Sequence, residues 1–304
     1  PSFGRSGGRY DVVVLGEAHL DIRMTTTTLD DGKVVLKDRA QELGFSLGGK
    51  GAIEAVWSAR LGVGTKFITR LGSDFAGDFM SKTLITSGVD LSERALLPLK
   101  TLPDFKGKTF VEAGSCIILE GTSNVDNMQL NTKNIDVKDA EDAKIFAASA
   151  KFLLLQDELG EDIIKATFPS GDGSSTTGSF RKILSCWPKG LGREDAKQFD
   201  ILILQWHNLR SIFPDEAMNE WRVEQAVRLI EKLHTEMRKS SAWIVVNTFK
   251  NYIVTYDESG PSIIPIPYTH GTSKSKLNFT GTHDALVGTL VASLCEFDKD
   301  DESK

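Results

Sequence analysis

Cysteine and histidine are scarce in this chain. The three cysteines, Cys116, Cys186 and Cys295, are far apart and odd in number, which excludes a disulfide framework and a CxxC-type metal motif. We therefore expect free thiols and an intracellular, reducing compartment, the cytoplasm in the first place and an organelle as the alternative. The five histidines form no HxH or HExxH pattern, so the sequence indicates no zinc site.

Basic charge and long apolar runs are also missing. The 36 lysines and arginines are outnumbered by 42 acidic residues, which gives a net charge of −6. Nucleic acid is not expected as the main partner, because there is no basic excess to displace counterions. No membrane partner is expected either, because no apolar run approaches the ~18 residues of a membrane-spanning helix. The opening stretch, PSFGRSGGRY, lacks the apolar segment of a signal peptide, so we expect none here.

What the chain does contain is typical of a large α/β domain. Its 304 residues are 40% hydrophobic and 26% charged, which are ordinary values for a globular protein. Short apolar runs alternate with helical patterns, and this predicts a mainly parallel sheet with helices on both faces. The expected strands are residues 10–15, 65–71, 151–155, 199–204, 243–246 and 252–256. The expected helices are residues 52–62, 78–87 and 215–239.

Two β-rich segments do not fit this alternation. Residues 25–36 surround an Asp-Asp-Gly turn that is typical of a hairpin, and residues 109–119 form the second segment. Together they predict a small accessory sheet. Residues 169–179, PSGDGSSTTGS, have the low-complexity composition of a surface loop.

The segment at residues 278–294, NFTGTHDALVGTLVASL, carries the clearest chemical signal. A Gly-Thr loop leads into a helix of small and apolar residues, with Asp284 at the join. The unpaired N–H groups of a helix N-terminus favour anions, and a carboxylate beside them can take a proton from an alcohol. The same pattern also suits an ordinary helix with Thr280 or Thr282 near its cap. Taken alone, the segment favours the ordinary helix.

Three segments in this order resemble the ribokinase family of carbohydrate kinases, also called the PfkB family. They are GEAHLD at residues 16–21, LGGKGAIEAVWSARLGVGTKFITRLGSDFAG at residues 47–77, and the 278–294 segment. The resemblance implies one three-layer α/β/α ribokinase-like domain over residues 1–304, with a small β-sheet lid at about 22–46 and 104–121. It also implies transfer of the γ-phosphoryl group of ATP to a hydroxymethyl group of a sugar or related polyol, assisted by Mg²⁺.

The resemblance further implies roles for individual residues. The catalytic base corresponds to Asp284, and the anion-hole loop corresponds to Gly281, Thr282 and His283. The sugar contacts correspond to Asp21, Gly49, Lys50 and Glu158. The nucleotide contacts correspond to Asn247, Thr248, Lys250 and Asn278. The magnesium motif corresponds weakly to Gln205 and Asn208.

Simpler interpretations exist for several of these residues. Lys50 also suits a solvated lysine at a helix start, and Glu158 an ordinary acid after a buried strand. His283 either donates to a phosphate or is an exposed histidine near a helix cap. Trp57 lies on the apolar face of its expected helix, and we expect it in the core.

The chain departs from the family pattern mainly on the nucleotide side. The family's Gly-Ala-Gly-Asp loop reads GTHD at residues 281–284. Its Asn-x-x-Glu magnesium motif reads QWHN at residues 205–208, without the carboxylate that a hard cation prefers. Phe249 and Tyr252 stand where glycines leave room for a nucleotide, and Ile53 replaces an asparagine that contacts sugar.

Three functions follow from this combination. The principal hypothesis is a working sugar kinase with an unusual nucleotide site, which uses ATP and Mg²⁺. The first alternative is a catalytically silent member that acts as a scaffold or as a subunit of a larger assembly. The second alternative is a sensor that binds a small polyol. These alternatives stay open because a fold alone does not decide function. The expected partner is a small-molecule sugar, with a homodimer through the lid as a further option.

Overall fold

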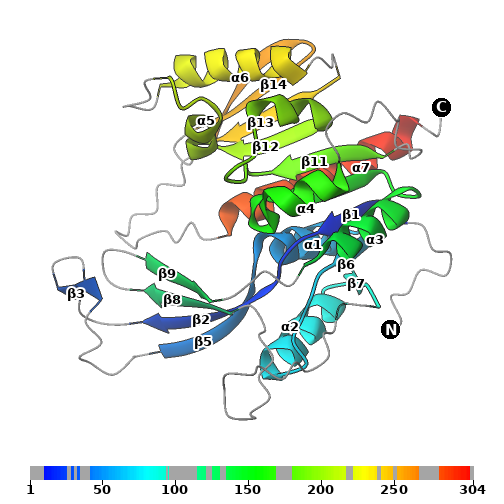
Figure 1. Ribbon diagram of the computed structural model, residues 1–304, viewed down its shortest axis with the longest axis vertical. Helices are drawn as coiled ribbons and strands as arrows, with labels where there is room; N and C mark the ends of the chain where they lie inside the picture. Colours follow the sequence, from blue (N-terminus) through cyan, green and yellow to red (C-terminus); the bar gives the residue numbers. More distant parts are fainter. Residues whose placement is uncertain are drawn as a thin grey trace.

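The computed structural model arranges the chain as one large β-sheet, a smaller sheet, a two-stranded ribbon and the surrounding helices (Figure 1). It describes residues 10–25, 29–30, 33–34, 42–93, 95, 115–120, 125–130, 135–168, 180–216, 222–237, 241–248, 252–266 and 281–301. The expected surface loop at 169–179, together with Lys250 and Asn278, lies outside these ranges. Within them, no helix combines the length and the apolar character that crossing a membrane requires.

The large sheet has nine strands in the order β15-β14-β13-β12-β11-β10-β1-β6-β7. They are β1 (Val12–Leu15), β6 (Thr65–Ile68), β7 (Asp90–Leu91), β10 (Phe152–Gln156), β11 (Arg181–Ser185), β12 (Ile201–Gln205), β13 (Trp243–Asn247), β14 (Tyr252–Asp257) and β15 (Gly260–Pro265). Neighbours from β7 to β13 are parallel, and β14 and β15 add an antiparallel edge. The prediction of a mainly parallel sheet is therefore confirmed, and the strand expected at 252–256 runs antiparallel.

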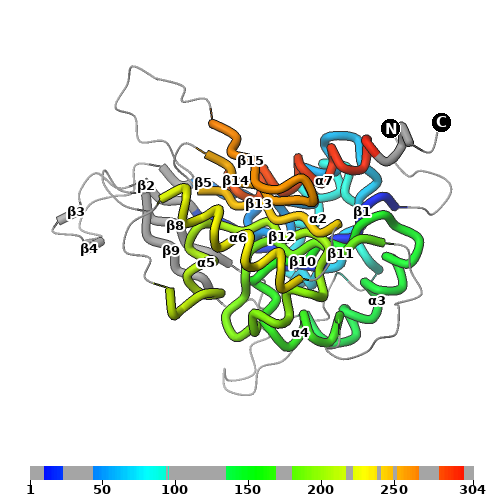
Figure 2. Tube along the Cα trace, turned by 90° about the horizontal axis from the view of Figure 1, so that it is seen from above, coloured from blue at the N-terminus to red at the C-terminus, as the bar shows by residue number. Residues whose placement is uncertain are grey.

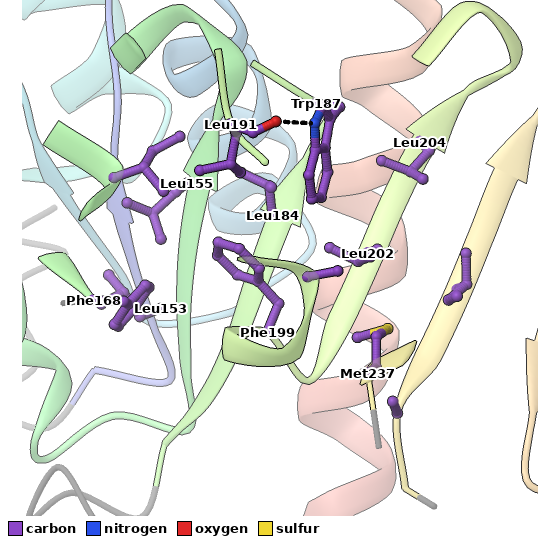
Figure 3. Packing of buried hydrophobic residues seen from close by; sticks show 14 of the residues in the cluster. Leu153, Leu155, Phe168, Leu184, Trp187, Leu191, Phe199, Leu202, Leu204 and Met237 are labelled. Carbon is purple, nitrogen blue, oxygen red and sulfur yellow. Dashed lines mark hydrogen bonds between the residues drawn. The ribbon is translucent and has the colours of Figure 1, made fainter. Parts of the chain in front are cut away.

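The apolar strands of the parallel part of the sheet contribute side chains to two hydrophobic cores, one on each face of the sheet. Val13 and Leu15 of β1 belong to one buried cluster, whereas Val12 and Val14 belong to the other. Successive side chains of a strand point to opposite faces, so a strand covered on both faces needs an unbroken apolar run. Figure 3 shows part of the first cluster, in which Phe199 packs with leucines from the strands.

Helices cover both faces of the large sheet and complete three layers. They are α1 (Lys50–Arg60), α2 (Phe75–Thr86), α3 (Val137–Ala147), α4 (Gly160–Thr167), α5 (Trp206–Ile212), α6 (Val223–Met237) and α7 (Thr282–Asp301), with 3₁₀ turns at Asp157–Leu159 and Arg193–Gln198. The first cluster contains residues of α3 to α6, and the second contains residues of α1, α2 and α7. Figure 2 shows α3 and α4 on one side of the sheet and α7 on the other.

The smaller sheet has four strands in the order β5-β2-β8-β9. They are β2 (His19–Thr25), β5 (Glu42–Gly48), β8 (Ser115–Glu120) and β9 (Val125–Leu130), and only the β2–β8 pairing is parallel. It extends to one side of the large sheet in Figure 1. A short antiparallel ribbon, β3 (Leu29–Asp30) with β4 (Lys33–Val34), lies where the sequence predicts a hairpin. The ribbon strands β3 and β4 and most of β8 fall in the two segments singled out by sequence, whereas β2, β5 and β9 lie wholly or largely outside residues 25–36 and 109–119. The role of the smaller sheet as a lid stays a prediction.

Candidate active site

Most residues that the sequence singles out gather where the parallel strands end. β1 leads into Glu17, and β10 leads into Asp157 and Glu158. The carboxyl ends of parallel strands share one edge of a sheet, and ligands of α/β proteins bind at such edges. Helix α1 begins at this edge, where the backbone N–H of its first residue, Lys50, donates to Glu158. Helix α7 begins beside α1, with Gly281 next to the side chain of Ile53.

The glycines before and within the start of α1 permit close approach of three backbone segments. Gly49 has φ of +88°, and a Cβ atom there would lie 2.6 Å from the carbonyl oxygen of Glu17. A Cβ at Gly16 would lie 2.8 Å from Cα of Gly51, and 2.1 Å from the side-chain oxygen of Gln156. Only glycine accommodates such contacts, so the glycine-rich segment packs α1 directly onto the end of β1.

Asp21 belongs to the same packed region. It is buried on β2, and a Cβ at Gly48 would meet its Oδ1 atom at 2.1 Å, so the carboxylate lies against the bare backbone of Gly48. The glycine pair predicted to border a sugar site therefore makes room for an acid from the smaller sheet. This is a close approach of backbone to a polar group.

Lys50 is held by the two acids that follow β10. Its backbone N–H donates to Oε2 of Glu158 at 2.9 Å, and its ammonium group forms an ion pair with Asp157. Burial alone would lower the pKa of Lys50, but the carboxylates of Asp157 and Glu158 beside the ammonium raise it, so the side chain is charged. Lys50 is therefore a paired and partly buried lysine, and the interpretation as a solvated lysine is wrong.

Glu158 lies in a second group of polar side chains at the base of the smaller sheet. Nε2 of His19 lies 3.1 Å from Oε2 of Glu17, and both side chains are buried. Burial raises the pKa of Glu158 to about 7, against the opposing effects of His19 and Lys50. Burial would lower the pKa of His19, but the hydrogen bond to Glu17 and the charge of Glu158 give a net rise.

The start of α7 has the geometry of an anion site. Gly281 has φ of +77°, and its carbonyl accepts the N–H of Ala285 at 3.0 Å, so the helix begins directly after it. Thr282 is exposed, whereas His283 and Asp284 are buried. The first N–H groups of a helix have no partner within the helix, and the helix dipole adds positive potential there. The residues present therefore suit the phosphate groups of a nucleotide.

The buried pair at this helix start has unusual protonation. Burial, with the charge of Lys50 and the neighbouring His207, lowers the pKa of His283 to about 3, so its ring is neutral. Burial raises the pKa of Asp284 to about 6, with Lys50 lowering it and Asp157 raising it. His283 is 3% exposed, so the interpretation as an exposed cap histidine is wrong.

A buried glutamate on α1 was not singled out by the sequence. Glu54 is fully buried, and its Oε2 accepts a hydrogen bond from Nε2 of Gln156 at 2.7 Å. Burial, with the nearby charge of Asp284, raises the pKa of Glu54 well above its usual range. The sequence does show an acid within the apolar helix AIEAVWSA, but a solvent-exposed glutamate on the surface of that helix would give the same pattern.

Cys186 is the other residue that sequence reasoning missed. It follows β11, has φ of 63°, and its N–H donates to the carbonyl of Ile203 at 2.8 Å. A left-handed backbone is uncommon for residues other than glycine and is often found at functional sites. Burial raises the pKa of its thiol well above the usual range, so Cys186 is a neutral group beside Lys50.

The predicted nucleotide side is less well formed. Gln205 and Asn247 pair across β12 and β13, and the hydroxyl of Thr248 donates to the carbonyl of Tyr252 at 2.6 Å. Oδ1 of the buried Asn208 accepts the backbone N–H of Gln205 at 2.8 Å, which caps α5. Neither Gln205 nor Asn208 supplies a carboxylate, so the pair fits a magnesium ion poorly.

Comparisons with known proteins agree with this architecture. The family model described as pfkB family carbohydrate kinase matches residues 9–303. A ribokinase of Staphylococcus aureus (strain COL) is 29% identical over 292 residues, which cover 93% of this chain and 86% of the relative. The chain therefore belongs to the pfkB family of carbohydrate kinases.

Solved structures show the same fold. The ribokinase from Thermotoga maritima has a TM-score of 0.71 at 18% identity, covering 94% of this chain and 86% of that one. The ribokinase of Arabidopsis thaliana complexed with ribose and ATP has a TM-score of 0.66 at 18% identity, covering 95% and 86%. The fold is thus ribokinase-like, as the sequence predicts.

Proposed function

We propose that this chain is an ATP-dependent sugar kinase that phosphorylates a hydroxymethyl group of a sugar or related polyol. The observation that carries the proposal is the placement of Asp284 in the first turn of α7, buried and within the electrostatic field of Lys50. Family membership supports a carbohydrate as the acceptor. Because two relatives are ribokinases, ribose is the first sugar to test.

The acid–base step follows from the environment of Asp284. In this proposal its carboxylate receives the proton of the hydroxymethyl group as the alcohol oxygen bonds to phosphorus. A pKa of about 6 makes it a stronger base than an exposed aspartate while keeping it ionised at neutral pH. ATP, when bound, supplies the phosphoryl group and the leaving group.

In this proposal the start of α7 stabilises the negative charge of the transferred phosphoryl group. The backbone N–H groups of Gly281, Thr282 and His283 are the donors, and the helix dipole strengthens them. A neutral His283 adds no positive charge, so these backbone groups carry the stabilisation on this side. Gln205 and Asn208 fit a magnesium ion poorly, and no step proposed here uses that ion.

The acceptor would lie between α1 and the smaller sheet. Asp21, Lys50 and Glu158 offer a carboxylate, an ammonium group and a second carboxyl group to sugar hydroxyls, and Gly49 lets the backbone approach closely. Asp157 holds the ammonium of Lys50 in place. We propose the four-stranded sheet as the lid over this substrate, with Asn247 and Thr248 on the nucleotide side.

A turnover assay over a panel of pentoses, hexoses and polyols tests the proposal. We expect ADP release that depends on one class of sugar and that yields one phosphate monoester per ADP. The silent-scaffold alternative is favoured by one observation, the use of the Asn208 amide as a helix cap. That alternative predicts no binding of ATP at millimolar concentration in isothermal titration, a result that would overturn the kinase proposal.

A further inference from the structure

A cluster of three side chains at the base of the smaller sheet has the arrangement of a metal site. Glu17 follows β1, His19 begins β2, and Glu158 follows β10. One ligand atom from each of the three lies within 4.8 Å of the other two. Glu17 and His19 are 4% and 3% exposed, so two of the three groups are removed from bulk water.

The spacing of the atoms suits one shared ion. Nε2 of His19 and Oε2 of Glu17 are 3.1 Å apart. Two ligands that each lie about 2.0–2.2 Å from an ion, at angles near 90–109°, are roughly 3.0–3.5 Å apart. The partly exposed Glu158 places a carboxylate oxygen within 4.8 Å of both of these ligand atoms. Its Oε2 atom accepts the N–H of Lys50 at 2.9 Å, and a carboxylate has lone pairs for an additional ligand bond.

The charge balance also favours a cation here. The carboxyl groups of Glu17, Glu158 and the buried Asp21 all act on the imidazole of His19, and the ammonium of Lys50 is shared between Glu158 and its ion-pair partner Asp157. Buried carboxylates are costly unless they are paired or coordinate a metal. A protonated His19 offers one positive charge to this group, whereas a divalent ion offers two.

We propose that Glu17, His19 and Glu158 bind one divalent transition-metal ion, with zinc as the reference ion. Imidazole and carboxylate together suit zinc, iron, cobalt or nickel, whereas calcium and magnesium prefer oxygen ligands. Three protein ligands leave a coordination position for water or for a hydroxyl group of a bound molecule. The site shares Glu158 with the proposed sugar site, but metal binding does not require kinase activity. It departs from the sequence-based expectation of no zinc site.

The test is metal binding to the full chain after dialysis against a chelator. We expect isothermal titration with Zn²⁺ to show one site per chain, and Co²⁺ to give visible absorption of an ion with nitrogen and oxygen ligands. Glu17→Gln and His19→Ala should each weaken Zn²⁺ binding by roughly 10–100-fold or more. Glu231→Gln, on the exposed face of α6, is the matched control and should bind like the wild type.

Circular dichroism of each variant shows whether it is folded, and Glu17→Gln keeps the test open if His19→Ala does not fold. Absence of stoichiometric Zn²⁺ binding to the wild type would overturn the proposal. Zn²⁺ affinity unchanged in a folded Glu17→Gln variant would overturn it as well, because the ion would then lie elsewhere. Either result leaves the kinase proposal standing, because the variants change only Glu17 and His19 and keep Glu158, which both sites use; sugar phosphorylation is measured separately.

Discussion

At the scale of single residues, the buried acids Glu54 and Asp284 are expected to set how stability and turnover depend on pH. Glu54 is fully buried and accepts one hydrogen bond from Gln156, and burial raises its pKa well above the usual range. In the unfolded chain, Glu54 ionises at its ordinary pKa. As pH rises above that value, the unfolded chain releases a proton that the folded chain keeps, so rising pH favours unfolding.

Glu54→Gln should therefore stabilise the protein at neutral and alkaline pH. The glutamine can keep the bond to Gln156 and does not ionise. We expect its melting temperature at pH 8 to exceed that of the wild type by roughly 2–4 °C for each kcal/mol gained, with little difference at pH 4.5. Scanning calorimetry at the two pH values measures this, and a gain of equal size at both would contradict the raised pKa.

Asp284 predicts the pH dependence of turnover. Its pKa is raised by burial to about 6, and the base must be ionised to accept a proton. We expect kcat to be nearly constant above pH 7 and to fall about tenfold per pH unit below pH 6, as for a single ionisation. A kcat that stays constant down to pH 4.5 would show that Asp284 does not act as the base.

The sequence predicts only part of the site at residue level. The role of Gly49 could be anticipated, because close approach of backbone to another group needs a glycine. The burial of His283 could not, because helix-start residues are usually exposed and only tertiary packing covers this one. Trp57 is 40% exposed, so its predicted place in the core is wrong.

At the scale of elements, helices α1 and α7 pack so closely that only a glycine fits at one point of their contact. A Cβ at Gly288 of α7 would lie 2.6 Å from Cβ of Trp57 and 2.7 Å from the carbonyl oxygen of Glu54. The hydroxyl of Ser58 donates to the carbonyl of Gly288 at 3.3 Å, which links the two helices at the same point. This packing holds the start of α7 against the glycine-rich start of α1.

Gly288→Ala should disturb that packing. An added methyl group would clash with backbone, so we expect a loss of roughly 1–3 kcal/mol in the free energy of unfolding. Gly44→Ala in β5 is the matched control, because nothing lies within 4 Å of a Cβ there. Urea denaturation compares the two, and equal stabilities would mean that the helices do not pack this closely.

Elements with unbroken apolar runs were predictable, and those with mixed composition were not. The runs at 151–155 and 199–204 correspond closely to β10 and β12. The strand β11 was missed because two basic residues begin it and its apolar run is short. The helices α3 and α4 were missed because polar residues interrupt their patterns, and packing against the sheet fixes them.

At the scale of the whole molecule, two cores on either side of one sheet hold the proposed site together. The parallel strands bring the acids after β1 and β10 to one edge, and α1 and α7 bring Lys50 and Asp284 to the same edge. The three-layer arrangement with a mainly parallel sheet could be predicted from the alternation of strands and helices and from the family resemblance. The mutual distances of these groups could not, because they depend on crossovers between segments far apart in the sequence.

In the proposed mechanism, Asp284 removes the proton of a sugar hydroxyl. The most direct test is to monitor the formation of sugar phosphate by phosphorus NMR. The wild type is compared with Asp284→Asn and Asp78→Asn. Asp78 is an exposed aspartate on α2 paired with Lys82, so its variant controls for loss of a carboxylate elsewhere. We expect turnover by the wild type, a kcat lowered by roughly 10²–10⁴-fold in Asp284→Asn, and an unchanged kcat in Asp78→Asn. Equal rates for the wild type and Asp284→Asn would contradict it.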